Sequence, residues 1–319
     1  MRATPTPVPP LLIAPGLLLA SCAIFANPTA ETLAKDAAYR ARVEVGAFAE
    51  LPAGTCYYEL GGPPTADTDE PLLVLVHGFS VPSFIWDPTF AAAVAGQRPV
   101  LRLDLFGRGH SSNPDVVYDV DLFADQVIDL LDHLRVHQPV DLVGLSMGGA
   151  VATRAASKRP DRVRKLVLVD SSGFSPDYGD NYDPSPVTAR QVAAFQREVM
   201  TGWAAGQRAD FYQPERFPQW TDRCRPLLRH KGFSRALLST LRSLRSLEKD
   251  HAALQAAAFP VHLVWGRQDL ACPFEVAEPL IHARLPRATT HLIDACGHLP
   301  QMEQPEIFEA LLFDEILNG

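Results

Sequence analysis

The chain has 319 residues, of which 47% are hydrophobic and 21% are charged, a balance typical of a soluble globular domain. Its formal net charge of −8 argues against nucleic-acid binding, which requires a basic surface. A chain of this length can bury a large core, and an α/β protein of this size is often one domain with insertions.

The first residues differ in composition from the rest of the chain. Residues 11–20 are apolar, but the stretch is too short and too interrupted by Pro15 to span a bilayer. Residues 1–26 resemble a secretory signal, and the run Leu19–Cys22 resembles a bacterial lipobox in which the cysteine is lipidated. This segment predicts an exported protein of the cell envelope or periplasm, with membrane association through a lipidated Cys22. The alternative is a proline-rich start of a cytoplasmic protein.

The predicted secondary structure begins after this segment. Residues 27–54 carry Ala, Glu, Lys and Arg at helical density, which predicts a helical or linker extension with an amphipathic helix over Glu31–Val45. The segments that follow are apolar and β-branched, as is typical of strands buried on both faces. They are Thr55–Leu60, Leu72–Val76, Val100–Leu103, Val140–Val143, Lys165–Val169, Val261–Trp265 and Thr290–Ile293. Helical patterns such as residues 121–136 lie between most of them, so we predict a mostly parallel sheet.

One interval breaks this alternation. Residues 171–260 separate two predicted strands, and a single crossover helix needs far fewer residues. Its first part is rich in Pro, Asp and Tyr and predicts a loop, whereas the remainder predicts helices with scattered aromatic side chains. We interpret the interval as a helical cap, or lid, over an α/β core made of residues 55–170 and 261–319. The aromatic side chains either line a pocket or form the cap's own core.

A candidate nucleophile stands between a strand and a helix. The run Gly144–Gly149 (GLSMGG) contains the G-x-S-x-G pattern of a nucleophile elbow, in which a strained turn exposes the Oγ of Ser146. Glycines on either side allow neighbouring backbone to approach without a Cβ clash. The helix begins just after Ser146, so its free N–H groups point at any negative charge that forms there. Alone, the pattern is weak, because it also occurs in ordinary glycine-rich turns.

Two later loops supply the partners that this nucleophile needs, in the order acid and then histidine. Asp269 follows the predicted strand that ends at Trp265, and His298 follows the last predicted strand. The carboxyl ends of parallel strands share one edge of a sheet, so these loops can meet at Ser146. We therefore predict nucleophilic catalysis, with His298 as the base and Asp269 orienting its imidazole. Asp170 also ends a strand and is the alternative acid.

The oxyanion that forms during such chemistry needs backbone donors. The predicted donors are the N–H groups of Met147, just after the nucleophile, and of Phe79, in the loop that His77 opens. Phe84 and Trp86 are candidates for the mouth of a substrate pocket.

We recognise no metal-binding or cofactor-binding motif in the sequence, and the predicted chemistry needs neither a metal nor a cofactor. Cys272 follows Asp269 closely, and Cys296 just precedes His298. A disulfide between these two loops is a hypothesis that requires an oxidising compartment. Two free thiols are the alternative.

Five ordered motifs make the chain resemble the α/β-hydrolase family of lipases, esterases, meta-cleavage product hydrolases and cofactor-free haloperoxidases. They are HGFS at 77–80, DLFGRGHS at 104–111, GLSMGG at 144–149, WGRQD at 265–269 and CGH at 296–298. The resemblance implies an α/β-hydrolase fold, with a mostly parallel doubly wound sheet and a helical cap inserted after the sixth strand of that fold.

The resemblance does not fix the substrate. We expect a serine hydrolase that cleaves carboxylic esters of small to medium acyl groups, monoacylglycerol among them, through an acyl-enzyme on Ser146. Its partner is then a small-molecule ester, and no nucleic acid. One alternative is a C–C bond hydrolase of the meta-cleavage type, or a cofactor-free enzyme similar to perhydrolases and haloperoxidases. A non-catalytic binding protein is a second alternative, against which the complete set of Ser146, Asp269 and His298 argues.

Overall fold

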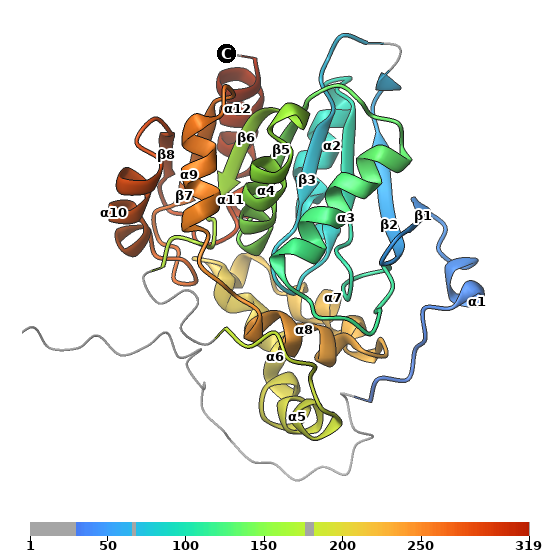
Figure 1. Ribbon diagram of the computed structural model, residues 1–319. Helices are drawn as coiled ribbons and strands as arrows, with labels where there is room; N and C mark the ends of the chain where they lie inside the picture. Colours follow the sequence, from blue (N-terminus) through green and yellow to red (C-terminus); the bar gives the residue numbers. More distant parts are fainter. Residues whose placement is uncertain (1–29, 66–67, 176–181, 319) are drawn as a thin grey trace, which may run out of the picture.

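The computed structural model describes residues 30–65, 68–175 and 182–318, and an eight-stranded sheet with helices on both faces forms its centre (Figure 1). The strand order is β1-β2-β4-β3-β5-β6-β7-β8. Strands β3 to β8 pair in parallel, whereas β2 pairs antiparallel with both β1 and β4. Their bounds are β1 Ala47–Leu51, β2 Gly54–Gly61, β3 Leu73–Val76, β4 Val100–Leu103, β5 Val140–Leu145, β6 Val163–Val169, β7 Val261–Gly266 and β8 Thr289–Ile293. The predicted α/β fold with a mostly parallel sheet is therefore confirmed.

The central strands are apolar because both of their faces are covered. Every residue of β3 and β5 is buried. One helical layer consists of α3 Val120–His133, α4 Met147–Lys158, α9 Glu248–Ala256 and α10 Phe274–Arg284. The other consists of α2 Asp87–Ala95, α11 Pro300–Glu303, α12 Pro305–Ala310 and the C-terminal turns of η8 Leu311–Leu317. Each layer buries its own hydrophobic core against one face of the sheet.

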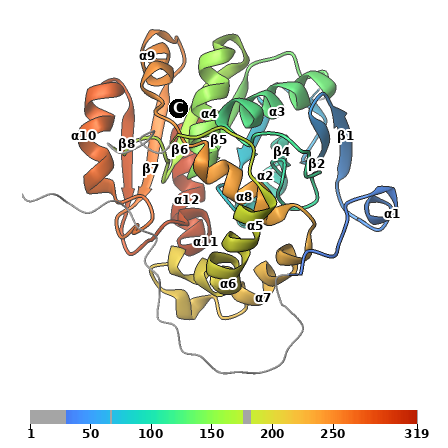
Figure 2. The same cartoon turned by 60° about the horizontal axis from the view of Figure 1, so that its bottom comes forward.

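The long interval between β6 and β7 forms a group of short helices across the carboxyl ends of the strands (Figures 1 and 2). They are α5 Ala189–Phe195, η4 Gln196–Met200, α6 Thr201–Gly206, η5 Gln207–Asp210, η6 Pro214–Arg216, α7 Trp220–Cys224, η7 Arg225–Arg229 and α8 Phe233–Arg242. We call residues 189–242 the cap. It follows β6, the sixth strand, as the resemblance implied. Helix α9 comes from the same predicted interval, residues 171–260, but it packs against α4 beside the sheet.

The helix expected over Glu31–Val45 is wrong for most of its length. Only α1, Ala37–Arg40, is helical, and the side chain of Asp36 caps its first turn by accepting from the N–H of Tyr39. Ahead of α1 the chain is extended, and Leu33 forms a β-bridge with His230 of the cap. The composition favours a helix, but this tertiary pairing overrides a weak local preference. The end of the predicted extension is also a strand, β1, which pairs with β2.

Residues 31–40, which we call the strap, join the cap to the core. The Glu31 carboxylate accepts hydrogen bonds from the N–H groups of Gly232 (2.6 Å) and Ser234 (2.7 Å) at the start of α8. Nζ of Lys35 donates to the carbonyl of Ser111 at 2.6 Å, in the core loop after β4. Burial lowers the pKa of Lys35 to about 7, whereas the carboxylate at the helix N-terminus makes a charge-assisted contact. The strap thus fastens one end of the cap to the core.

The predicted leader, residues 1–26 with Cys22, lies outside the residues that the structure describes. Of the helices that the structure does describe, none combines the length and the apolar character needed to cross a bilayer.

Candidate active site

Ser146 stands in a strained turn between β5 and α4. Its backbone has φ 54° and ψ −121°, and its side chain is half-exposed. The turn is tight because a Cβ on Gly148 would lie 2.3 Å from the carbonyl oxygen of Val76, and one on Gly144 would lie 2.2 Å from the carbonyl oxygen of Gly148. A non-glycine residue with positive φ is uncommon and points to a functional constraint. The turn therefore has the form of the predicted elbow, and its glycines stand where another backbone segment passes too close for a Cβ atom.

The loop after β3 lies against this elbow. A Cβ on Gly78 would be 3.2 Å from the Cβ of Ser146. The buried His77 holds the loop, since its Nδ1 lies 2.8 Å from the carbonyl of Gly78 and its Nε2 accepts from the N–H of Leu105 at 2.9 Å. Burial lowers the pKa of His77 to about 4, which fits a neutral ring in this role. The N–H groups of Phe79 and Met147 make no hydrogen bond with the described part of the chain, so both stay available as oxyanion donors.

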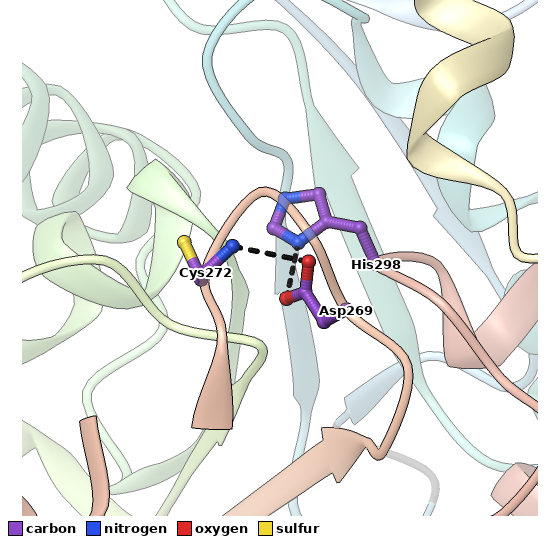
Figure 3. Close-up of side chains that lie close together, drawn as sticks. All are labelled: Asp269, Cys272 and His298. Atoms are coloured by element: carbon purple, nitrogen blue, oxygen red, sulfur yellow. Dashed lines mark hydrogen bonds and ion pairs between the residues drawn. The ribbon is translucent and has the colours of Figure 1, made fainter. Parts of the chain in front are cut away.

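His298 and Asp269 form a buried hydrogen-bonded pair (Figure 3). Nδ1 of His298 lies 2.8 Å from Oδ2 of Asp269. The other carboxylate oxygen accepts from the N–H groups of Ala271 (2.7 Å) and Cys272 (3.0 Å). With donors on both oxygens, the carboxylate is held in its ionised form.

The two members of this pair shift each other's pKa in opposite directions. Burial raises the pKa of Asp269, but the facing imidazole and the hydrogen bonds outweigh it, and the net pKa is lowered. Burial lowers the pKa of His298, but the Asp269 charge and its hydrogen bond, with the charges of Asp210 and Glu303, raise it overall. The imidazole therefore binds a proton more strongly than an ordinary histidine.

The structure does not hydrogen-bond Ser146 to His298. Neither the Oγ of Ser146 nor the Nε2 of His298 has a hydrogen-bond partner among the described residues. The elbow and the acid–base pair are linked through neighbouring strand ends: Ser146 N–H donates to the carbonyl of Val169 at 2.8 Å, and Asp170 N–H to that of Val264 at 2.9 Å. Catalytic hydrogen bonds are often long without substrate and tighten when it binds.

Asp170, the alternative acid, lies behind the pair rather than on the imidazole. Its backbone has φ 42°, and its Oδ1 accepts from the N–H of Gly266 at 2.9 Å. Its other oxygen, Oδ2, is buried and has no hydrogen-bond partner among the described residues. Burial, and next the Asp269 charge, raise the pKa of Asp170 well above its ordinary value, which favours the protonated carboxyl group. It is Asp269 that the structure places on His298.

The two aromatic candidates for the pocket mouth have different positions. Trp86 is completely buried, and its ring packs against Phe308 at 6.2 Å between centroids. The prediction that it lines a pocket mouth is therefore wrong. Trp86 comes just before α2, and its ring belongs to the hydrophobic core on that face of the sheet. Phe84 is half-buried and meets the edge of Trp220 in the cap at 5.7 Å.

The cysteines near the pair are free thiols. Cys272 and Cys296 form no disulfide. In Figure 3 it is the backbone nitrogen of Cys272, not its sulfur, that is joined to Asp269. Between residues 30 and 318, the two gaps excepted, Asp269, Cys272 and His298 are the group that could hold a metal, with donor atoms within 4.8 Å of one another. Asp269 and His298 already satisfy each other, and burial, then nearby carboxylates, raise the pKa of the Cys272 thiol, which disfavours the thiolate that a metal needs.

The cap and α11 bring two further carboxyl groups to this site, which the sequence analysis missed. The N–H of His298 donates to the carbonyl of Asp210, in the cap, at 2.9 Å. Burial raises the pKa of the Asp210 side chain to about 6, with the charge of His298 opposing and that of Asp269 adding to it. Glu303, on α11, accepts from the N–H of Gly297 at 2.8 Å. No motif marks Asp210, whereas the nearness of Glu303 to His298 in sequence was an available signal.

A small apolar cavity of about 20 Å³ lies beside the nucleophile helix. The residue after the nucleophile, Met147, lines it together with Tyr118, Phe123, Val151, Thr240 and Leu247. The cavity thus lies between α3, α4 and the C-terminal end of cap helix α8.

Comparisons with known proteins agree with this fold. Residues 73–311 match the alpha/beta hydrolase family. The chain is 29% identical over 256 residues to a 2-hydroxymuconate semialdehyde hydrolase of Pseudomonas sp. strain CF600, covering 76% of this chain and 85% of that protein. Among solved structures, an enol-lactonase from Burkholderia xenovorans LB400 superposes with a TM-score of 0.70 at 22% identity, over 86% of this chain and 100% of that one. An esterase from Thermogutta terrifontis superposes with a TM-score of 0.68 at 24% identity, over 84% of this chain and 97% of that one.

Proposed function

Since this chain belongs to the alpha/beta hydrolase family, we propose that it is a serine hydrolase that cleaves carboxylic esters through an acyl-enzyme on Ser146. Two observations carry the proposal: the buried 2.8 Å hydrogen bond between His298 Nδ1 and Asp269 Oδ2, and the strained turn that holds Ser146 at the carboxyl end of another strand of the same sheet. A serine needs an adjacent base to become a nucleophile, and that base needs a third group to orient it.

The reaction has two halves. In the first, His298 Nε2 takes the hydroxyl proton of Ser146 while Oγ attacks the ester carbonyl carbon. The tetrahedral intermediate collapses as His298 returns the proton to the leaving alcohol, which leaves an acyl-enzyme. In the second, His298 takes a proton from water, the resulting hydroxide attacks the acyl carbon, and the proton returns to Ser146 Oγ as the carboxylic acid leaves. Asp269 stabilises the imidazolium in both halves.

Two features of the site support an uncharged ester. The N–H groups of Phe79 and Met147 are free to stabilise a single oxyanion beside Ser146. Asp210 places a further carboxyl group near His298, which disfavours a substrate with its own carboxylate close by.

The second candidate is hydrolysis of a C–C bond in a dienoic ketone. The observation that favours it is the similarity to the protein named 2-hydroxymuconate semialdehyde hydrolase. Ser146, with His298 as its base, would attack a ketone carbonyl carbon, and the leaving group would be a carbon that must then be protonated. An ester is the easier substrate for this site, because its alkoxide leaving group takes the proton directly from His298.

A series of p-nitrophenyl esters of graded chain length tests the proposal. We expect hydrolysis of the short esters, and loss of at least about 10³-fold of it in Ser146→Ala. A fluorophosphonate should label the wild type and the control Ser185→Ala, whose serine is exposed and donates to Asp183, but not Ser146→Ala. Turnover of a dienoic ketone without turnover of any ester would replace the first candidate by the second. An unlabelled wild type would reject both.

A further inference from the structure

We propose that Glu303 is a positioning residue that fastens the His298 loop to the cap, so that the imidazole is correctly placed only while the cap is seated. The inference rests on the proposed function, in which His298 is the base. Glu303 is not one of the three proposed catalytic residues Ser146, Asp269 and His298. The proposal gives the cap an indirect role in catalysis, which is to keep His298 in position.

The Glu303 carboxylate bridges two segments that are far apart in sequence. Its Oε1 accepts from the N–H of Gly297 in the His298 loop at 2.8 Å. Its Oε2 accepts from the N–H groups of Tyr212 (2.8 Å) and Gln213 (3.4 Å) in the cap. The residue is 1% exposed, so these donors replace water. All three partners are donors, which is the pattern that a carboxylate, but not an amide, can satisfy.

The two bridged segments are also in direct contact. A Cβ on Gly297 would lie 2.7 Å from the nitrogen of Tyr212 and 2.8 Å from the carbonyl oxygen of Asp210. The N–H of His298 donates to that same carbonyl at 2.9 Å. If the cap lifted at this point, His298 would lose a backbone bond and Glu303 would keep a buried charge without its donors from the cap. Burying a charge without partners is costly, so the seated cap and the ordered loop stabilise each other.

Glu303 also acts on His298 through its charge. The groups that raise the pKa of His298 are Asp269 first, then Asp210 and Glu303. They come from three different parts of the fold: the loop after β7, the cap, and α11. Neutralising Glu303 therefore removes one cause of the raised pKa and shifts the protonation of His298 to lower pH.

Glu303→Gln is the variant that separates charge from shape, because the amide has nearly the same size but turns an NH₂ group toward a backbone N–H. We expect kcat to fall by on the order of 10- to 100-fold, as is usual when a catalytic group is misplaced. The acid limb of the kcat/KM profile should move to lower pH. The backbone amides of Gly297 and Tyr212 should both exchange their hydrogens faster than in the wild type. Glu303→Asp keeps the charge but shortens the reach, so it should keep the wild-type acid limb while still losing kcat.

Glu306→Gln, an exposed neighbour on α12, is the control and should match the wild type in all three measurements. Wild-type kcat and an unmoved acid limb in a folded Glu303→Gln would overturn the proposal. So would faster exchange at Gly297 with Tyr212 unchanged, because the two segments would then be uncoupled. Hydrogen exchange does not depend on turnover. If fluorophosphonate labelling of the wild type fails, the proposed function falls, while the exchange result still decides whether Glu303 couples the loop to the cap.

Discussion

Asp170 and Asp269 follow the neighbouring strands β6 and β7, and both carboxyl groups are buried, but their pKa values move in opposite directions. Burial, and next the Asp269 charge, raise the pKa of Asp170, whereas the facing imidazole of His298 lowers that of Asp269. Asp269 is therefore the carboxyl group that carries the charge, because His298 faces it.

This division of roles predicts that Asp170→Asn is tolerated. The amide is uncharged and can still accept from the N–H of Gly266, and asparagine accepts the positive φ of 42° at this position. We expect kcat/KM within a few-fold of the wild type and little change in melting temperature. Asp170→Ala should instead lose about 1–2 kcal/mol of stability, because alanine is strained at positive φ and the N–H of Gly266 loses its acceptor. If Asp170→Asn is as inactive as Asp269→Asn, then Asp170 acts through a negative charge and the assignment is wrong.

The raised pKa of His298 predicts the pH dependence of the reaction. Catalysis requires the neutral imidazole, so kcat/KM should rise with pH through the pKa of His298 in the free enzyme, which lies above the ordinary value of about 6.5. Asp269→Asn removes the main cause of the shift and leaves burial to dominate. We expect it to lower kcat by on the order of 10³- to 10⁴-fold and to move the remaining limb to lower pH.

Asp294→Asn serves as the control for that measurement, since Asp294 is exposed and pairs with Arg267 on the surface. Its profile should superpose on that of the wild type. An acid limb that stays in place in Asp269→Asn would show that another group, not His298, limits the rate.

The elbow predicts a sharp contrast between two glycine substitutions. A Cβ on Gly148 would meet the Val76 carbonyl oxygen at 2.3 Å, and neither backbone can move without distorting the turn at Ser146. Gly148→Ala should therefore abolish fluorophosphonate labelling and lower the melting temperature. A Cβ on Gly202, in cap helix α6, would have nothing within 4 Å, so Gly202→Ala should stabilise the protein by about 0.5–1 kcal/mol. Equal behaviour of the two variants would contradict the packing seen at the elbow.

The strap predicts that an N-terminal residue stabilises the cap. Removing the Glu31 carboxylate leaves the N–H groups of Gly232 and Ser234 without their acceptor at the start of α8. Glu31→Ala should cost about 1 kcal/mol and speed hydrogen exchange at these two amides. Glu44→Ala, an exposed residue of the same extension, should leave them unchanged. If the amide of Gly232 exchanges as slowly in Glu31→Ala as in the wild type, the strap does not hold this end of the cap.

The sheet could be predicted from the sequence because its strands are buried on both faces. Segments such as Leu72–Val76 and Val140–Val143 are continuously apolar or nearly so, a pattern that few other structures produce. The meeting of Asp269 and His298 could also be anticipated, because both follow parallel strands and such strands end at one edge. These inferences use local patterns and one general rule of topology.

The parts that could not be predicted depend on contacts across long separations in sequence. The pairing of Leu33 with His230 turns a helix-like composition into an extended strap, and nothing near Leu33 in sequence indicates it. Residue type alone favours a pocket position for Trp86, but the packing of α2 and α12 decides that it is buried. Glu303 follows the His298 motif closely, yet its role depends on Tyr212, which belongs to a cap without recognisable motifs.

The contacts that hold the cap are unevenly distributed. Glu31 holds the start of α8, and Glu303 holds residues 212 and 213, whereas α5, Ala189–Phe195, has no buried residue. Surface substitutions usually change stability little, so α5 is the α-helix of the cap whose sequence can vary most freely without unfolding the protein.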